Sequence, residues 1–316
     1  MRMRSNRLFG ARRFVWRIRR SGPRLARPLS AVLPAAPPPR SPILILGCPR
    51  SGTGLLLEAL LRSPELRSVQ SEGHILWDEF HHPRDRGWDS DALGRSDVSE
   101  RERDYVRLAI RWWTRGRRFV DKTPASCLRI PYLEALLPGA TFVFLRRRAA
   151  DNVSSLMEAW RARPRFVKYR LPEPLSGLGP LNGNLWSLVL VPGWRELRSA
   201  SLEEICAQQY LACNEAALAA RGRIEPARWI EVAYEDLLAD PVSELQRLYR
   251  QLGLDFVEKA HAEAEALARR PARTTLTDPE PDKWRRQNPE AVERILPLVA
   301  EIERRLGYRA VDVVGA

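Results

Sequence analysis

The segment from Ile43 to Leu57 limits the folds open to this chain more sharply than the rest of its sequence. It reads ILILGCPRSGTGLLL. A short apolar run breaks at Gly47 and Pro49, passes through a small polar turn and then becomes apolar again, which predicts a strand, a loop and a helix. In such a unit, the loop N–H groups and the positive end of the helix dipole converge on one point. The segment therefore predicts a binding site for an anion such as phosphate.

The side chains of this loop add further donors. Arg50 supplies a planar fork of N–H groups, and Ser51 and Thr53 supply hydroxyls. The glycine pattern of a nucleotide-triphosphatase loop is met at Gly52, but Thr53 and Gly54 follow where that motif has Lys and Ser or Thr. We therefore expect an anion site and no metal. The alternative is an ordinary strand-to-helix turn in which the glycines serve conformation only.

Two further apolar strands are each followed by a helix. One begins at Arg118 and runs into a loop at 121–123, and the other covers Thr141–Leu145. Strands that alternate with helices predict an α/β fold of three layers, with a central parallel sheet flanked by helices. Function in such sheets gathers at the carboxyl ends of the strands. Because Arg50, Lys122 and Arg147 stand at three such ends, we expect one shared cationic pocket.

The basic residues are distributed unevenly. The formal net charge is +13, yet residues 1–40 hold 11 arginines and no acid, which leaves 41 basic and 39 acidic side chains in the rest. The remainder therefore carries a net charge of only +2, which argues against nucleic acid as a partner. We expect a basic, Pro-rich arm over 1–41 and one domain over 42–316.

Two interpretations of the arm stay open. It is either a disordered, solvated segment with a stiff Pro-rich linker, or a basic amphipathic anchor on an anionic membrane, because Phe9, Phe14 and Trp16 lie among its arginines. No apolar stretch approaches the roughly 20 residues that cross a bilayer. The four cysteines, at positions 48, 127, 206 and 213, lie in apolar segments and predict buried thiols in a reducing compartment. We expect a cytoplasmic protein, with the inner membrane surface as the place of any peripheral contact.

The remaining segments predict further elements. Helices are expected over 100–117, 201–220 and 289–306, and a strand over 228–232 leads to a turn at 234–237. Residues 161–200 are dense in Pro, Gly and Trp and lack a clear period, so we expect an irregular insertion that covers the acceptor. Within it, Trp186 and Trp194 either stack on a sugar or form the core of the insertion.

Three pieces together resemble the sulfotransferases that use 3′-phosphoadenosine 5′-phosphosulfate (PAPS). Pro49–Thr53 resembles the 5′-phosphosulfate loop of the branch that carries Arg where cytosolic members carry Lys. Arg147, followed eight residues later by Ser155, is similar to the 3′-phosphate site. Tyr234–Pro241 and the distal Lys283–Arg285 are common in bacterial members. The resemblance spans roughly residues 42–308.

The resemblance implies roles on the sulfuryl side of the pocket. Arg50 and the backbone of 51–54 (Ser51, Gly52, Thr53 and Gly54) would hold the 5′-phosphate, and Lys122 would reach the sulfuryl oxygens. Glu72 lies where the Arg-bearing branch keeps a catalytic Glu, so it is favoured as the base that accepts the acceptor proton. His74 is the rival base. The plain alternatives are a solvated acid, a satisfied loop histidine and a surface cation at a strand end.

The resemblance also implies roles at the other end of the donor. Arg147 would hold the 3′-phosphate together with Ser155, which is expected at a helix start; Arg146 is the rival of Arg147. Three further groups would complete the donor site: Lys283 and Arg285 over the same phosphate, Trp284 near the adenine, and Tyr234 at a phosphate. The alternatives are an ion-paired strand-end arginine, a solvated turn before the last helix and a core tyrosine.

The function implied is metal-independent transfer of a sulfuryl group from PAPS to a hydroxyl or amine of a carbohydrate, a glycolipid or another metabolite. Two alternatives stay open. One is a metal-dependent P-loop kinase of a small molecule, which the missing Lys and Mg²⁺ ligand disfavour. The other is a non-catalytic scaffold that associates with membranes, and the presence of Glu72, Lys122 and Arg147 argues against such a loss of activity.

Overall fold

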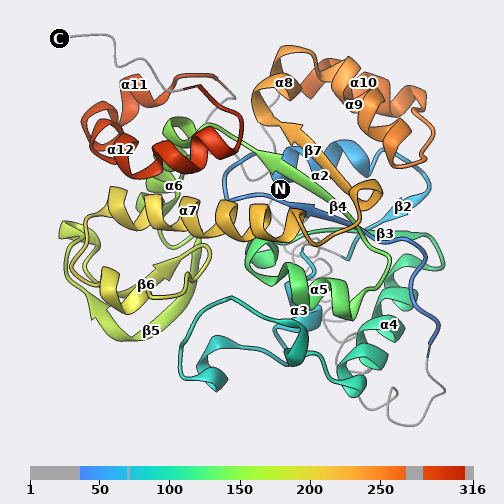
Figure 1. Cartoon of the computed structure of the whole chain (residues 1–316), viewed down its shortest axis with the longest axis horizontal. Helices are drawn as coiled ribbons and strands as arrows, with labels where there is room; N and C mark the ends of the chain where they lie inside the picture. The colour runs from blue at the N-terminus through green and yellow to red at the C-terminus, as the bar shows by residue number, and fades with distance from the viewer. Residues whose placement is uncertain (1–35, 70–71, 268–279, 310–316) are drawn as a thin grey trace, which may run out of the picture.

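The fold is organised around a parallel sheet, seen in the computed structural model, which describes residues 36–69, 72–267 and 280–309 (Figure 1). Five strands lie in the order β2-β3-β1-β4-β7, and every neighbouring pair is parallel. This confirms the predicted α/β class. The strands are β1 (Ile43–Leu46), β2 (Leu66–Arg67), β3 (Arg118–Lys122), β4 (Thr141–Arg146) and β7 (Trp229–Ala233).

The central strands are apolar on both faces because helices cover both. Leu44 and Phe142 are paired across β1 and β4 and belong to one core cluster, whereas Ile43 and Val143 belong to the cluster on the opposite face. Successive side chains of a strand point to opposite faces, so a strand covered on both sides reads as a continuous apolar run. The predicted three-layer arrangement is confirmed.

The helices divide between the two faces. One face carries α2 (Thr53–Leu60), α8 (Tyr234–Ala239), α9 (Pro241–Gln251) and α10 (Glu258–Leu267). The other packs against α4 (Glu100–Thr114), α5 (Ile130–Leu136), α6 (Ala149–Arg161) and α7 (Leu202–Arg221), with α12 (Pro289–Arg305) resting on α6 and α7. Shorter pieces are α3 (His74–Trp77), α11 (Trp284–Gln287) and the 3₁₀ turns 83–86, 95–97, 124–129, 179–181, 194–197 and 226–228.

The expectation of an irregular insertion over 161–200 is wrong. The segment contains an antiparallel hairpin of β5 (Val167–Leu175) and β6 (Gly183–Ser187). Tyr169 and Leu171 alternate inward along β5, but prolines at the outward positions hide this period in the sequence. Trp186 and Trp194 are fully buried, and Trp186 packs edge-on against Trp160. They form the core of the hairpin, so the sugar-stacking alternative is also wrong.

Two local predictions are corrected by backbone geometry. The helix expected to reach residue 117 ends at Thr114, because Arg115 and Gly116 both adopt left-handed conformations. The turn expected at 234–237 is instead the first part of α8. Most of the predicted arm, residues 1–35, lies outside the described residues. Within those that are described, no helix is both long and apolar enough to cross a membrane.

Candidate functional site

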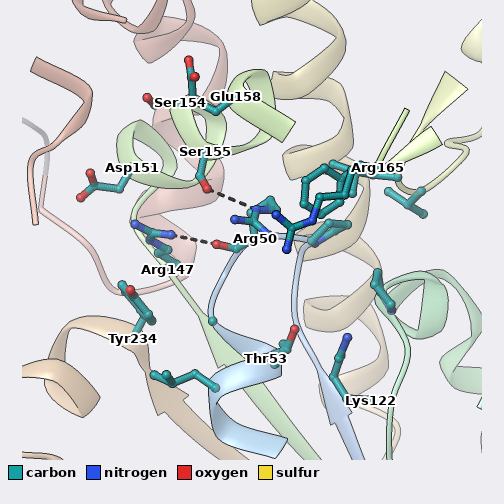
Figure 2. A pocket seen from close by; sticks show the side chains of 18 of the residues that line it. Arg50, Thr53, Lys122, Arg147, Asp151, Ser154, Ser155, Glu158, Arg165 and Tyr234 are labelled. Atoms are coloured by element: carbon teal, nitrogen blue, oxygen red, sulfur yellow. Dashed lines mark hydrogen bonds between the residues drawn. The ribbon is translucent and has the colours of Figure 1, made fainter. Parts of the chain in front are cut away.

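A pocket of about 500 Å³ lies at the carboxyl ends of β1, β3 and β4 (Figure 2). This volume falls within the roughly 300–1,000 Å³ of sites that bind small ligands. Its walls come from the loop after β1, the loop after β3, the start and one face of α6, the hairpin and the segment before α12. The strand ends therefore meet in one cationic pocket, as the sequence predicts.

The anion loop is tightly held between β1 and α2. The N–H of Ser51 donates to the carbonyl of Cys48 over 3.0 Å, and that of Gly47 donates to Cys127 Sγ over 3.0 Å. Gly52 has a φ of 99°, and a Cβ at this position would lie 2.5 Å from the ring of Tyr234. Arg50 has a φ of 71°, a conformation that residues other than glycine rarely adopt and that is found at functional sites.

The two hydroxyls of the loop are placed differently. Thr53 lines the pocket, as do Gly52 and Gly54. Ser51 is buried beneath the loop, and among the described residues its Oγ has no hydrogen-bond partner. Ser51 does not line the pocket, and its N–H already donates to Cys48, so this residue holds the loop in shape rather than facing the pocket.

Guanidinium groups converge above the loop (Figure 2). Arg50 Nε donates to Ser155 Oγ over 3.4 Å, and its guanidinium lies 5.1 Å from the centre of the Phe166 ring. Burial, and after it the charges of Arg147 and Arg165, lower the pKa of Arg50 to about 10. Positive charges crowded in a partly buried site are stabilised by a bound anion.

The arginines that follow β4 point in different directions. Arg147 Nη1 donates to the carbonyl of Arg50 over 2.8 Å, and its guanidinium lies 4.3 Å from the centre of the Tyr234 ring. Arg146 instead stacks on the ring of Tyr308 at 4.7 Å and does not line the pocket. Side chains alternate along a strand, so neighbouring arginines at its end point to opposite sides. The structure places Arg147, rather than Arg146, at the site.

One face of α6 lines the pocket with polar side chains. Its members recur at helical spacing and are Asp151, Ser154, Ser155 and Glu158. Because α6 begins at Ala149, Ser155 lies in the middle of the helix, and the prediction that it stands at a helix start is wrong. The two acids had no predicted role. Burial raises the pKa of Asp151 despite the nearby charge of Arg147.

A carboxylate, an amine and an imidazole meet on the opposite side of the pocket. Lys122 Nζ forms an ion pair with Glu72 Oε1, and His74 Nδ1 lies 3.4 Å from Glu72 Oε2. Burial acts to raise the pKa of Glu72, but the hydrogen bond from His74 and the charge of Lys122 outweigh it and lower the pKa to about 2. The sequence predicted each of these three residues near the anion loop, and the structure brings them into contact.

Asp121 is buried next to Lys122 and fixes the loop that carries Glu72 and His74. Its carboxylate accepts hydrogen bonds from the N–H of Gly73 (2.6 Å) and the hydroxyl of Thr123 (2.9 Å). Gly73 lies so close that a Cβ there would be 2.7 Å from Asp121 Cγ and closer still to the ring of Trp77. Burial raises the pKa of Asp121 to about 6. The signal in the sequence was an acid at the end of an apolar strand, but no role was predicted for it.

The segment before α12 contributes unequally. Lys283 and Trp284 line the pocket, as does Tyr234. Arg285 does not, because its guanidinium lies over the Trp284 ring at 4.5 Å and 4.0 Å from Asp282. The indole of Trp284 is buried and packs with Val292. Of the predicted Lys-Trp-Arg set, two members therefore face the site.

The hairpin supplies residues that the sequence did not single out. Arg165, Phe166 and Lys168 line the pocket beside Leu188, which has a φ of 63°. Lys168 Nζ is anchored by Asp91, at 2.9 Å and 3.0 Å from its two carboxylate oxygens. The absence of a clear period over 161–200 concealed both the hairpin and the fact that it reaches the anion loop.

The chain is similar in sequence to known sulfotransferases. A model of the sulfotransferase family matches residues 42–173 and 184–258, which is more than half of the chain. Nodulation protein NoeE of Sinorhizobium fredii (strain NBRC 101917 / NGR234) is 26% identical over 227 residues, which cover 67% of this chain and 49% of that protein. The chain thus spans about half the length of that relative.

Two solved structures share the fold. Sulfotransferase STF9 from Mycobacterium avium superposes with a TM-score of 0.54 at 16% identity, covering 88% of this chain and 79% of that one. The sulfotransferase domain of the Synechococcus PCC 7002 olefin synthase superposes with a TM-score of 0.50 at 20% identity, covering 87% and 98% respectively. At this level of identity, the likeness concerns the fold.

Proposed function

The chain belongs to the sulfotransferase family, and from that premise we propose that it transfers a sulfuryl group from PAPS to a hydroxyl or amine of an acceptor. The observation that carries the proposal is the convergence of Arg50, Arg147 and Ser155 on the anion loop. Family membership sets aside the kinase alternative. The scaffold alternative is decided by the assays below.

The residues present suit a bisphosphorylated nucleotide. Two guanidinium groups line the pocket: Arg50, which donates to Ser155 on α6 and stands beside the loop N–H groups, and Arg147, which lies over the Tyr234 ring. Among the described residues, Arg147 Nε is buried without a hydrogen-bond partner, which leaves a donor for a phosphate oxygen. Tyr234 and Trp284 supply aromatic surface beside these donors. Arg285 points away from the pocket, so we assign it no contact.

When bound, the donor supplies the sulfuryl group and a phosphate as leaving group. Arg50 and the loop N–H groups would hold the 5′-phosphate, and such preorganised donors stabilise the negative charge that a leaving phosphate gains in the transition state. Lys122 Nζ is placed to neutralise sulfuryl oxygens. Arg147 and Ser155 hold the 3′-phosphate and so align the donor for in-line transfer. Lys283 adds a cation to the wall next to Trp284.

We propose that Glu72 accepts the proton that the acceptor loses. Its carboxylate borders the pocket, is ionised at neutral pH and contacts Lys122, the group assigned to the sulfuryl oxygens. His74 remains the rival, because its imidazole also lines the pocket and its Nδ1 faces Glu72, an arrangement that would orient Nε2. In that case Glu72 would position the base rather than act as it.

The apolar part of the pocket wall supports a proposal for the acceptor. Pro124, Ala125, Leu188 and Val189 line the pocket, and the buried Trp186 and Trp194 are not available for stacking on a sugar. Among carbohydrate, glycolipid and small-molecule acceptors, we therefore propose one whose hydroxyl is carried on an apolar body, such as a lipid. We also propose a cytoplasmic location, which is supported by four buried cysteines that are free thiols.

The experiment that tests the function is isothermal titration with 3′-phosphoadenosine 5′-phosphate (PAP) and, separately, ATP, each with and without Mg²⁺. We expect PAP to bind tightly and independently of Mg²⁺, and ATP to bind more weakly. A preference for ATP with Mg²⁺ would revive the kinase alternative. Binding of neither nucleotide would favour the scaffold, and PAP binding without turnover on any acceptor hydroxyl or amine would point to an inactive member of the family.

A further inference from the structure

The outer face of α4 carries a concentration of arginines that the proposed function does not use. Residues 101–118 contain seven arginines and two acids. One of the acids, Glu102, is fully buried and forms hydrogen bonds with His81 and Tyr132. The buried side of α4 carries the apolar residues Tyr105, Val106, Ala109 and Ile110. The arginines therefore gather on the opposite side, where Asp104 and the exposed Glu100 at the helix start are the acids that remain.

These arginines follow a helical repeat. Arg103, Arg107, Arg111 and Arg115 recur every four residues, a spacing at which like charges on a helix repel one another. Within the described residues, none of the four forms an ion pair with an acid, whereas Arg294 and Arg304 of α12 pair with Glu203 and Glu301. The stripe therefore does not stabilise the fold. A partner that brings negative charge would remove its repulsion.

An exposed aromatic side chain lies beside the stripe. Trp112 is 73% exposed, the most exposed large apolar side chain of the described residues, and Arg111 and Arg115 on either side of it are also exposed. Leu108, one turn earlier, is only half-buried. A basic helix face that carries Trp and Leu suits the boundary between lipid headgroups and acyl chains, where arginine binds phosphate and indole lies at the headgroup level.

A second basic segment joins the fold at the same place. Arg118 Nε donates to the carbonyl of Ser41 over 2.6 Å, so the described chain enters beside the carboxyl end of α4 (Figure 1). Arg40 and Arg117 are both exposed there. The 40 residues up to this point contain 11 arginines and no acid. The basic segment is therefore connected to the domain beside the end of α4.

We propose that the outer face of α4 and the turn after it, residues 101–117 with the exposed Trp112 among them, docks on a membrane rich in anionic phospholipid. The remainder of the domain is close to neutral, with a net charge of +2 over 41–316, so the attraction is local to this face. The exposed indole beside the arginines favours a lipid surface over nucleic acid, because indole lies at the headgroup level of a membrane.

The test uses the full chain and vesicles of phosphatidylcholine with and without phosphatidylserine, followed by flotation. We expect binding that requires phosphatidylserine and weakens with salt. Each arginine near an anionic surface contributes about fivefold to partitioning, so the double variant Arg111→Gln/Arg115→Gln should bind roughly 25-fold more weakly. Trp112→Ser should weaken binding without changing the charge. The matched control is Arg294→Gln/Arg304→Gln on α12, which removes the same charge elsewhere and should bind like the parent protein.

Three outcomes would overturn the proposal. Unchanged partitioning of both α4 variants would mean that residues 1–40 alone bind the vesicles. An equal loss in the α12 control would mean that net charge, rather than this face, decides binding. Loss of duplex RNA binding in the α4 double variant, with vesicle binding intact, would assign the face to nucleic acid. Unchanged PAP affinity and thermal melting show that the variants are folded, because none of these residues lines the pocket.

Discussion

The pKa of Glu72 is set by its two neighbours, Lys122 and His74. Burial alone would raise the pKa of its carboxyl, and Lys122 and His74 reverse that effect. A carboxylate with a pKa of about 2 is a weak base. If an anion draws Lys122 Nζ away from Glu72, the lowering effect of the Lys122 charge is lost and the proton affinity of Glu72 rises. We therefore expect the strength of this base to depend on the occupancy of the anion site beside it.

The assignment of Glu72 as the base can be tested by substitution. Because a positioned base contributes about 10²- to 10⁴-fold, Glu72→Gln should lower kcat by that factor, and PAP affinity should be retained. His74→Gln should lower kcat less. Steady-state kinetics with PAPS and titration with PAP provide the two measurements. A larger loss in His74→Gln than in Glu72→Gln would make His74 the base.

The pH profile gives an independent check. A base must be deprotonated, so activity falls as the pH drops through its pKa. With Glu72 as the base, kcat/KM should show no acid limb between pH 5 and 8, because the pKa of Glu72 is about 2. An acid limb that His74→Gln abolishes would indicate His74. A limb that Asp121→Asn abolishes would instead belong to Asp121.

Asp121 yields a prediction about stability. Its pKa rises from 3.8 to about 6 on folding, so it favours the folded state at low pH and this contribution is lost as the pH rises through 6. An asparagine keeps an acceptor for Gly73 and a donor for Thr123. Asp121→Asn should therefore raise the free energy of unfolding by about 1–3 kcal/mol at pH 8 and by about half as much at pH 5. Urea unfolding at the two pH values tests this, and a variant less stable than the parent at pH 8 contradicts it.

At the scale of elements, the end of β4 separates two neighbouring arginines. Arg147 turns toward the anion loop, and Arg146 turns toward Tyr308. Strand alternation decides this, and the rings of Tyr234 and Tyr308 hold each guanidinium in place. The same end of the sheet therefore provides one arginine to the pocket and one to the packing of the carboxyl-terminal segment.

This separation makes a matched pair of variants available. Arg147→Ala should weaken PAP binding by roughly 10- to 150-fold, because a hydrogen bond to a charged group contributes about 1.5–3 kcal/mol. Arg146→Ala should leave PAP affinity within about twofold of the parent value and lower stability instead, since its ring contact is lost. Titration calorimetry and thermal melting distinguish the two effects. Equal PAP affinity of the two variants would place the 3′-phosphate elsewhere.

At the scale of the whole molecule, Asp91 joins the hairpin to the body. Its fully buried carboxylate accepts hydrogen bonds from Lys168, from Tyr169 at 2.6 Å and from the N–H of Leu190 at 2.7 Å. It also pairs with Arg129, which is fully buried. Since Lys168 lines the pocket, this one side chain couples the position of the hairpin to the site.

Removal of the charge of Asp91 should have a large effect. Asp91→Asn leaves the buried Arg129 with Asp78 as its remaining carboxylate among the described residues, and loss of one partner from a buried ion pair costs about 3–5 kcal/mol. Glu173→Gln is the control, because its pairs with Arg195 and Arg198 are partly exposed and such pairs contribute about 0–1 kcal/mol. Urea unfolding measures both. Similar losses in the two variants would mean that Asp91 does not anchor the hairpin.

The parts of the site that were predictable are those coded locally. The strand, loop and helix around Arg50 follow from apolar runs and glycine breaks. The carboxyl ends of β1, β3 and β4 meet because parallel strands end at the same edge of a sheet. The middle position of Ser155 in α6, the burial of Ser51 and the outward turn of Arg285 were not predictable. Each depends on where a neighbouring segment lies, which local spacing does not encode.

The sequence by itself determined the alternation of strands and helices in the parallel sheet, the anion loop and the separation of a strongly basic segment from a nearly neutral domain. These are properties of short stretches and of composition, and they act before distant parts of the chain meet. Only the tertiary structure decided that Lys122 pairs with Glu72, that Asp91 anchors the hairpin and that Trp186 is buried. Such contacts join residues far apart in the chain, and their energies depend on burial and charge that exist only once the core has formed.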